Sequence, residues 1–153
     1  GCQGVVAGVL DSYNQVNIQA TQELVEASKN LEFTFHRAFD VAVDPYKAIE
    51  DLEALGVTRI LSSGQQPKAI DGIQLLKQLK NKAKKLQIMP GSGINKTNVI
   101  SFKEAGFKMV HFSALKNTPA ITGDAAVSFS QGVEGSSDQQ TIAEIIALIA
   151  QHS

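Results

Sequence analysis

The sequence lacks features that would assign it to several classes of protein. Its single cysteine, Cys2, excludes an internal disulfide framework and fits a reducing compartment. No apolar run approaches the roughly 20 residues of a membrane-spanning helix, so we expect no membrane partner. Neither sign of charge is in excess, since 14 Lys and Arg face 15 Asp and Glu, and this gives no reason to expect nucleic-acid binding. The 153 residues are enough for one domain with its own core, spanning residues 1–153.

Short β-rich runs alternate with longer segments of helical periodicity. The runs cover residues 4–10, 31–36, 57–62, 86–89 and 108–113. The helical segments have recognisable first residues: Asn17, Asp44 before Pro45, Pro67, Asn95, and Ser137 with Gln140 at capping-box spacing. Gly56 is placed to end the second helix in the left-handed conformation. Because the units recur about every 26 residues, the pattern predicts an α/β fold with a parallel sheet.

Two parallel folds fit this repeat. One is a flavodoxin-like doubly wound sheet, in which the first strand lies between two others in the order 2-1-3-4-5. The other is part of a TIM barrel, in which five of the eight units follow one another along an arc. The repeat alone slightly favours the five-stranded sheet, because a barrel would need roughly 80 further residues. Strand order separates the two.

Polar side chains gather where the β-rich runs end. The candidates are His36, Arg37 and Asp40 after the second run, Ser63 after the third, Gly91 and Gly93 after the fourth, and His111 and Ser113 in the fifth. In both folds these ends meet on one side of the sheet, so we expect a shared site there. We assign catalysis to His36, Arg37, Asp40 and His111, and anion binding to Ser63, Gly91, Gly93 and Ser113. Arg37 and Asp40 could instead form an ion pair that shapes the loop.

Strand alternation predicts which way the two histidines point. Thr34 and His36 share one face of the second run, opposite Phe33 and Phe35, which suit a face covered by helices. His36 would then point into a barrel, and His111 would do the same from the fifth run. A buried core histidine is an equally good interpretation of His111.

The fourth run ends in Gly91-Ser92-Gly93, a pattern that could cradle an anion. Glycines permit close approach of the backbone, and the start of the following helix offers N–H groups, with Ser113 nearby to complete the cradle. A metal site has little support. Copper(I) prefers thiolate and thioether ligands, and the chain offers Cys2, Met89 and Met109 without an HxH, HExxH or CxxC spacing. The metal ligands therefore stay unassigned.

Four motifs at these strand ends resemble segments of the CutC family. Residues 35–40 resemble its FHRAFD signature, 59–64 its RILTSG segment, 88–94 its IMPGGGI segment, and 111–114 its H-x-S-A strand end. The match runs in order along nearly the whole chain and includes the tail that contains Val127, Ser128 and residues 135–138. Since that family has a TIM-barrel fold, the resemblance implies strands four to eight of the barrel, with the first three units absent. Ser92 departs from the family's middle glycine and narrows the freedom of that backbone.

The resemblance implies a cytoplasmic protein of copper homeostasis, with copper(I) as its cofactor or cargo. It carries no copper ligand onto a residue of this chain. The alternative function is a TIM-barrel enzyme that acts on a small anionic or phosphorylated metabolite, with a histidine as general acid–base and Arg37 holding the anion. A barrel without three units would have open edges at residues 4–10 and 108–113, so we also expect the chain either to be marginally stable or to pair with a second copy in a homo-oligomer.

Overall fold

The computed structural model describes residues 1–29, 31–115 and 136–151, and it has an α/β fold. Its four strands are β1 (Gly4–Ala7), β2 (Glu32–Phe35), β3 (Arg59–Ser62) and β4 (Gln87–Pro90). Its helices are α1 (Ile18–Ala27), the 3₁₀ helix η1 (Arg37–Val41), α2 (Pro45–Ala54), α3 (Ile73–Lys82), α4 (Val99–Glu104) and α5 (Gln139–Gln151). The loop expected after the fifth run, with most of the tail that resembles CutC, lies outside the described residues.

The strands pair in parallel and in sequence order, β1-β2-β3-β4. Val6 lies opposite Thr34, Thr34 opposite Arg59, and Leu61 opposite Met89. This order places β1 at an edge of the described sheet, whereas a flavodoxin-like sheet would place it between two strands. The doubly wound alternative is therefore wrong, and the sequential order expected of barrel units is confirmed for these four strands.

The expected fifth strand, residues 108–113, does not form. A single parallel bridge joins Gly91 to His111, whose N–H donates to Pro90 O at 2.8 Å. Successive N–H groups along a strand point alternately to the strands on its two sides. The Gly91 N–H points towards β3, where it donates to Ser62 O. The N–H of residue 90 would therefore face the 108–113 segment, but Pro90 has none to donate. A proline at this position removes one of the hydrogen bonds that would extend the pairing.

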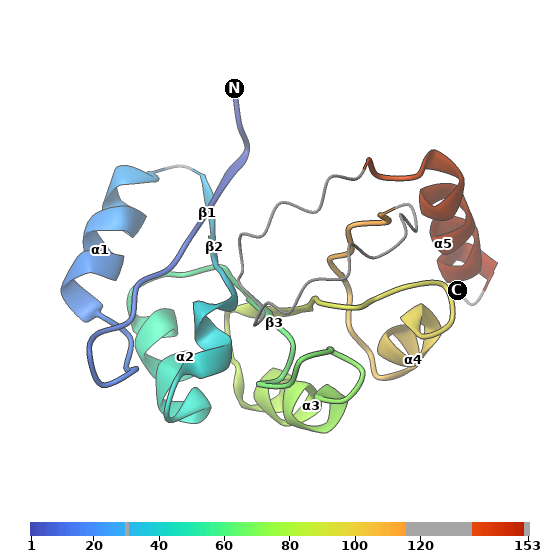
Figure 1. Ribbon diagram of the computed structural model, residues 1–153. Helices are drawn as coiled ribbons and strands as arrows, with labels where there is room; N and C mark the ends of the chain where they lie inside the picture. The colour runs from blue at the N-terminus through green and yellow to red at the C-terminus, as the bar shows by residue number, and fades with distance from the viewer. Residues whose placement is uncertain (30, 116–135, 152–153) are drawn as a thin grey trace, which may run out of the picture.

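The helices cover one face of the sheet, and the core lies between them and the strands. Figure 1 shows α1, α2 and α3 following one another along the outside of the strands. Phe33, Phe35, Ile60 and Ile88 are buried, which confirms that the phenylalanines of the second run face the core. On the opposite face of β1, Val6 keeps 63% of its surface exposed.

Three of the expected helix ends are confirmed because short local patterns encode them. Asn17 Oδ1 accepts from Ala20 N at 3.0 Å, which caps α1. Asp44 caps α2 through Tyr46 N and Lys47 N, and Pro45 is the first helical residue. Gly56 follows α2 with φ of +82°, a conformation that glycine adopts without a steric penalty.

Three other expected helix starts are wrong. The third helix begins at Ile73 rather than near Pro67, because residues before it contact the loop after β4: Ser92 Oγ donates to Pro67 O at 2.8 Å. The fourth begins at Val99, and Asn95 instead caps a separate turn through Thr97 N. The fifth is capped by Asp138 rather than Ser137. Within the described residues, no helix is both long and apolar enough to cross a membrane.

Candidate functional site

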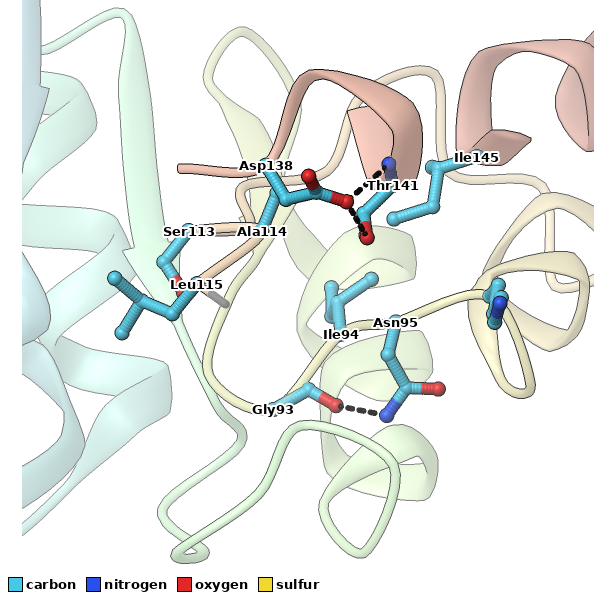
Figure 2. A pocket seen from close by; sticks show the side chains of 10 residues that line it. Gly93, Ile94, Asn95, Ser113, Ala114, Leu115, Asp138, Thr141 and Ile145 are labelled. Carbon is cyan, nitrogen blue, oxygen red and sulfur yellow. Dashed lines mark hydrogen bonds between the residues drawn. The ribbon is translucent and has the colours of Figure 1, made fainter. Parts of the chain in front are cut away.

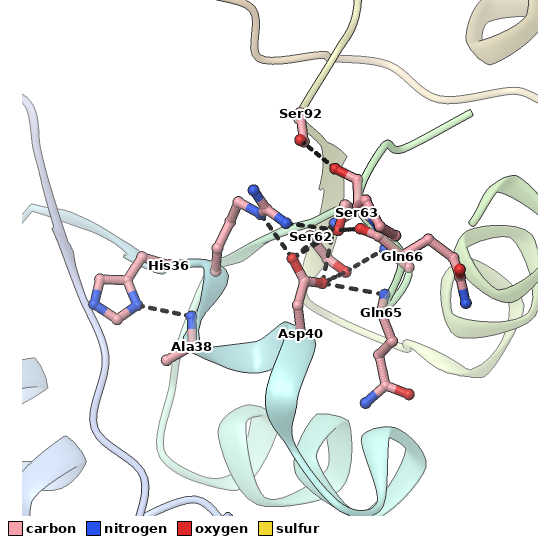
Figure 3. Close-up of polar contacts among 11 residues, drawn as sticks. His36, Ala38, Asp40, Ser62, Ser63, Gln65, Gln66 and Ser92 are labelled. Carbon is pink, nitrogen blue, oxygen red and sulfur yellow. Dashed lines mark hydrogen bonds and ion pairs between the residues drawn. The ribbon is translucent and has the colours of Figure 1, made fainter. Parts of the chain in front are cut away.

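Asp40 is the centre of a hydrogen-bond network that joins the loops after β2 and β3. Its carboxylate accepts from Arg37 Nε at 2.8 Å, from Ser62 Oγ at 2.6 Å and from Ser63 N at 3.0 Å (Figure 3). Ser63 Oγ donates to Asp40 Oδ2 at 2.9 Å, and Arg37 Nη2 donates to Ser63 Oγ at 2.9 Å. The structure therefore brings three of the expected site residues, Arg37, Asp40 and Ser63, into direct contact.

The exposure of this network indicates what it does. The Asp40 side chain is only 6% exposed, whereas that of Arg37 is 27% exposed. Each Asp40 oxygen already accepts at least two hydrogen bonds, so the carboxylate has little capacity left for a ligand proton. The geometry favours the structural interpretation of the Arg37–Asp40 pair: it fixes the two loops against each other.

His36 lies beside this network and has different contacts. It follows β2 directly, and its N–H donates to Ala7 O at 3.1 Å, which continues the pairing with β1. Its side chain caps η1, because Nδ1 accepts from Ala38 N at 3.2 Å. The half-buried ring lines a cavity of about 520 Å³ together with Arg37, Ala38, Val41 and Leu61. His36 thus has an apolar cavity on one side and the η1 backbone on another.

Two other expected anion ligands, Gly93 and Ser113, line a separate cavity of about 590 Å³. Figure 2 shows this cavity between the loop after β4, the segment around Ser113 and the start of α5. Its polar lining residues also include Asn95, Lys96, Asp138 and Thr141. Gly93 has φ of +66°, and its carbonyl accepts from Asn98 Nδ2 at 2.9 Å. Of the eight expected residues, His36 and Arg37 therefore line one cavity and Gly93 and Ser113 another, so the eight do not form a single site.

Gly91 and His111 lie between these two groups and are paired with each other. The Gly91 N–H donates to Ser62 O at 2.9 Å, so it has no hydrogen left for an anion. A side chain at Gly91 would come within 2.5 Å of Leu61 Cδ1 and 3.3 Å of His111 Cβ. The missing side chain at Gly91 therefore leaves room for Leu61 and His111. His111 itself is exposed, so it is not a buried core histidine.

The electrostatics of the second cavity are set by an ion pair. Lys96 Nζ donates to Glu144 Oε2 at 2.8 Å. This hydrogen bond, reinforced by the charge of Glu144, raises the pKa of Lys96, and the same bond lowers the pKa of Glu144. Asp138 also lines the cavity, and its Oδ2 accepts from Thr141 N at 2.9 Å and from Thr141 Oγ1 at 2.7 Å (Figure 2). The cavity is thus lined by one cationic residue, Lys96, and one anionic residue, Asp138. Each of them already has a hydrogen-bond partner in the protein.

Sequence reasoning did not assign several residues that complete the two sites. These are Ser62 and Gln65 around Asp40, and Asn95, Lys96, Asp138 and Thr141 around the second cavity. A signal existed for Ser62, because it belongs to the polar group Ser62-Ser63-Gly64 at the end of the third run. Asp138 has a helix-cap composition, since it precedes the apolar stripe of α5. Asn95 and Thr141 bond to residues within three positions in the chain, whereas nothing local to Gln65 and Lys96 indicates their partners, Ala42 and Glu144.

The comparisons with known proteins give a consistent result. Residues 1–116 match the model of the CutC family. The chain belongs to the CutC family. A CutC family protein from Pectobacterium atrosepticum is 43% identical over 114 residues, which are 74% of this chain and 45% of the relative. One from Glaesserella parasuis is 38% identical over 147 residues, 95% of this chain and 59% of the relative. The chain therefore spans about half the length of these CutC relatives.

A CutC crystal structure supports the fold. It is the structure of CutC from Streptococcus agalactiae, described as a proposed copper homeostasis protein, and it is 36% identical to this chain. The superposition has a TM-score of 0.66 and covers 71% of this chain and 55% of the other. The α/β fold with its parallel sheet is thus shared with a CutC protein, as the four sequence motifs indicated.

Proposed function

We propose that this chain corresponds to the last five strand–helix units of a CutC barrel, with residues 108–113 in the place of the fifth strand, and that it serves in copper homeostasis in the cytoplasm. The observation that carries the proposal is the CutC match over residues 1–116. The sequential parallel strands and the helices outside them agree with barrel units. The connection to copper comes from the name of the S. agalactiae neighbour.

Direct copper(I) binding would need a suitable set of donor atoms. Cys2 is exposed and free, and Met89 lies in β4. Across residues 1–29, 31–115 and 136–151, no three His, Cys, Asp or Glu side chains come together as a metal site. Copper(I) prefers a set of thiolate and thioether ligands, and Cys2 is the single cysteine of the chain. We propose that copper ligation, whether of a cofactor or a cargo, depends on residues outside the described ones.

An anaerobic copper(I) titration against a chromophoric chelator tests this proposal. We expect the 153-residue chain to hold copper weakly, and Cys2→Ser to abolish that binding. We expect the longer G. parasuis relative, which has further chain to supply ligands, to compete more strongly with the chelator. If the Cys2→Ser chain competed strongly with the chelator for copper(I), the proposal that the copper ligands lie outside the described residues would be contradicted. Unchanged copper tolerance in cells that lack the gene would contradict the role in copper homeostasis.

A second function, binding or turnover of a small anionic metabolite, is favoured by the cavity beside Gly93 and Ser113. This cavity lies at the carboxyl end of the sheet, and its lining residues include Lys96 and Thr141. Anion binding there must overcome the Asp138 carboxylate and compete with Glu144 for Lys96. The site therefore suits an anion that can replace Glu144 as the partner of Lys96.

Inorganic phosphate is the probe for this second function. Titration followed by amide NMR should shift the signals of Gly93 and Ser113, and Lys96→Ala should weaken the response. Lys84→Ala is the matched control, because Lys84 is also an exposed lysine but lies outside this cavity. Equal responses from both variants, or shifts spread evenly over the surface, would count against an anion site here.

A further inference from the structure

The imidazole ring of His36 is held on one edge by two backbone segments. Nδ1 accepts a hydrogen bond from the Ala38 amide at 3.2 Å, as Figure 3 shows. Directly after the neighbouring strand β1, a Cβ added to Gly8 would lie 2.8 Å from Nδ1 and 3.0 Å from Cε1 of His36, and 3.1 Å from Phe35 Cε1. The ring therefore fits closely between η1 and the backbone at Gly8, and the missing side chain of Gly8 allows this fit.

These contacts determine where the ring carries its proton. A backbone N–H can only donate, so Nδ1 must present a lone pair to Ala38. A neutral imidazole with a lone pair on Nδ1 carries its hydrogen on Nε2. A ligand therefore meets an N–H donor at Nε2 rather than a free lone pair. Metal ligation or proton acceptance at Nε2 would move the hydrogen to Nδ1 and place two N–H groups against each other.

Moving the proton would also disturb the network beyond His36. The Nδ1 bond caps η1, and η1 contains both Arg37 and Asp40. Asp40 in turn fixes the loop after β3 through Ser63. The tautomer of His36 is thus linked to the arrangement of the whole Asp40 network. This link favours one fixed tautomer with the hydrogen on Nε2, whereas a general base at Nε2 would need its hydrogen on Nδ1.

The cavity that His36 lines indicates which molecule would use this donor. Its other walls include the side chains of Ala38, Val41 and Leu61, which are apolar. The guanidinium of Arg37 lies at the same cavity, but the Asp40 carboxylate balances its charge. Within the described ranges, no protein atom accepts a hydrogen bond from His36 Nε2. A neutral molecule with one acceptor oxygen and an apolar body satisfies these groups.

We infer that His36 is a hydrogen-bond donor through Nε2, that Gly8 is its positioning residue, and that the cavity binds a small neutral carbonyl compound. The carbonyl oxygen would accept from Nε2 while its apolar group contacts Val41 and Leu61. This inference is independent of the copper role, because the tautomer is set by Ala38 and Gly8 alone. It assigns His36 to polarising a carbonyl group, in place of the general acid–base role expected from the sequence.

Long-range ¹H–¹⁵N correlation spectra of the 153-residue chain test the tautomer, with the signal assigned by its loss in His36→Asn. We expect the Nε2–H pattern in the parent chain. Gly8→Ala should displace the ring and change that pattern, while Val6→Ala, on an exposed position of the same strand, should leave it intact. An Nδ1–H pattern in the parent chain, or an unchanged pattern in Gly8→Ala, would overturn the inference.

The ligand is tested with benzamide, and with benzoate as its charged counterpart. His36→Asn keeps an oxygen that can cap Ala38 but loses the ring donor, so it separates binding from folding. We expect it to unfold at the same urea concentration as the parent while binding benzamide about tenfold more weakly, as for one lost hydrogen bond. His36→Ala should lose both the cap and the binding. Benzamide binding unchanged in His36→Asn, or tighter binding of benzoate than benzamide, would overturn the proposed ligand class.

Discussion

Asp40 and Ser63 are joined by three hydrogen bonds, although they lie on loops after different strands. Both Asp40 oxygens accept from Ser63 N, at 3.0 and 3.1 Å, and Oδ2 also accepts from Ser63 Oγ at 2.9 Å. A carboxylate bonded in this way acts as the connection between β2 and β3 at their carboxyl ends. The shape of the candidate site therefore depends on Asp40 more than on any other side chain around it.

Asp40→Asn should destabilise the protein strongly. The substitution leaves Arg37 without its charge partner and turns an acceptor oxygen into a donor NH₂ group near Ser63. Removing one member of a largely buried ion pair costs about 3 kcal/mol in the free energy of unfolding, measured by urea denaturation. Asp51→Asn, which removes an ion pair with Lys47 on the surface of α2, is the matched control. We expect a much smaller loss there, and equal losses in the two variants would contradict the central role of Asp40.

Glu53 should make stability depend on pH in the acid range. Partial burial raises the pKa of Glu53, but its bonds from the N–H groups of Lys84, Lys85 and Leu86 together outweigh burial, and the pKa lies below its ordinary value of 4.5. The folded state therefore holds the carboxylate charged at a pH where the unfolded state takes up a proton. Glu53 thus stabilises the fold above pH 4.5, and this contribution is lost as the pH falls through the lower folded-state pKa.

Glu53→Gln should accordingly lower the free energy of unfolding at pH 7 by about 1 kcal/mol, because a neutral amide accepts these bonds more weakly. The difference from the parent should shrink as the pH falls from 4.5 through the lower folded-state pKa, because Glu53 then takes up a proton in the folded protein too. Urea denaturation at several pH values measures both effects. Glu104→Gln, at an exposed position, is the control. A difference that stays constant over the acid range would show that Glu53 does not act through its charge.

Gly64→Ala should be far more harmful than Gly56→Ala, although both glycines have positive φ. A Cβ at Gly64 would lie 2.4 Å from Gly72 O, whereas nothing lies within 4 Å of one at Gly56. Each change incurs the left-handed penalty of about 1–2 kcal/mol, and only Gly64→Ala adds a clash with backbone. Thermal unfolding followed by circular dichroism compares the two variants. Similar melting temperatures would indicate that the loop after β3 can move away from Gly72.

The free edge of β1 should allow the chain to associate with a second copy. β1 pairs with β2 along one edge, and no described strand pairs with its other edge. Val6→Lys places a charge on this strand and should shift the mass measured by light scattering towards the monomer. Tyr13→Lys removes a still more exposed hydrophobic residue from a loop outside the sheet and should leave the mass unchanged. A parent chain that is monomeric at high concentration would refute the expected homo-oligomer.

The sequence was informative where a residue's neighbours in the chain determine its structure. Asn17, Asp44 and Pro45 mark helix starts through contacts within four residues, and the alternation of Phe33 and Phe35 identifies the buried face of β2. The four motifs that resemble CutC also identified the family correctly.

Contacts between distant segments could not be predicted in the same way. Ser137 was expected to cap the last helix, but its Oγ donates to Ser113 O, 24 residues away, and Asp138 provides the cap. Likewise, nothing around Asp40 in the sequence indicates that Ser62 and Ser63 complete its hydrogen bonds. The division of the site into two cavities has the same origin, since it depends on how the loops after β2, β3 and β4 pack together.

The contact between Gly8 and His36 also limits the order in which this sequence can change. Alanine at position 8 would force the imidazole ring of His36 to shift, whereas with a smaller residue 36 only the contact with Phe35 Cε1 at 3.1 Å would remain. The two positions should therefore show epistasis: in a double-mutant cycle, Gly8→Ala should cost less in the His36→Ala background than in the parent. Relatives that keep His36 should therefore also keep Gly8, 28 residues before it. The two positions should change together in evolution.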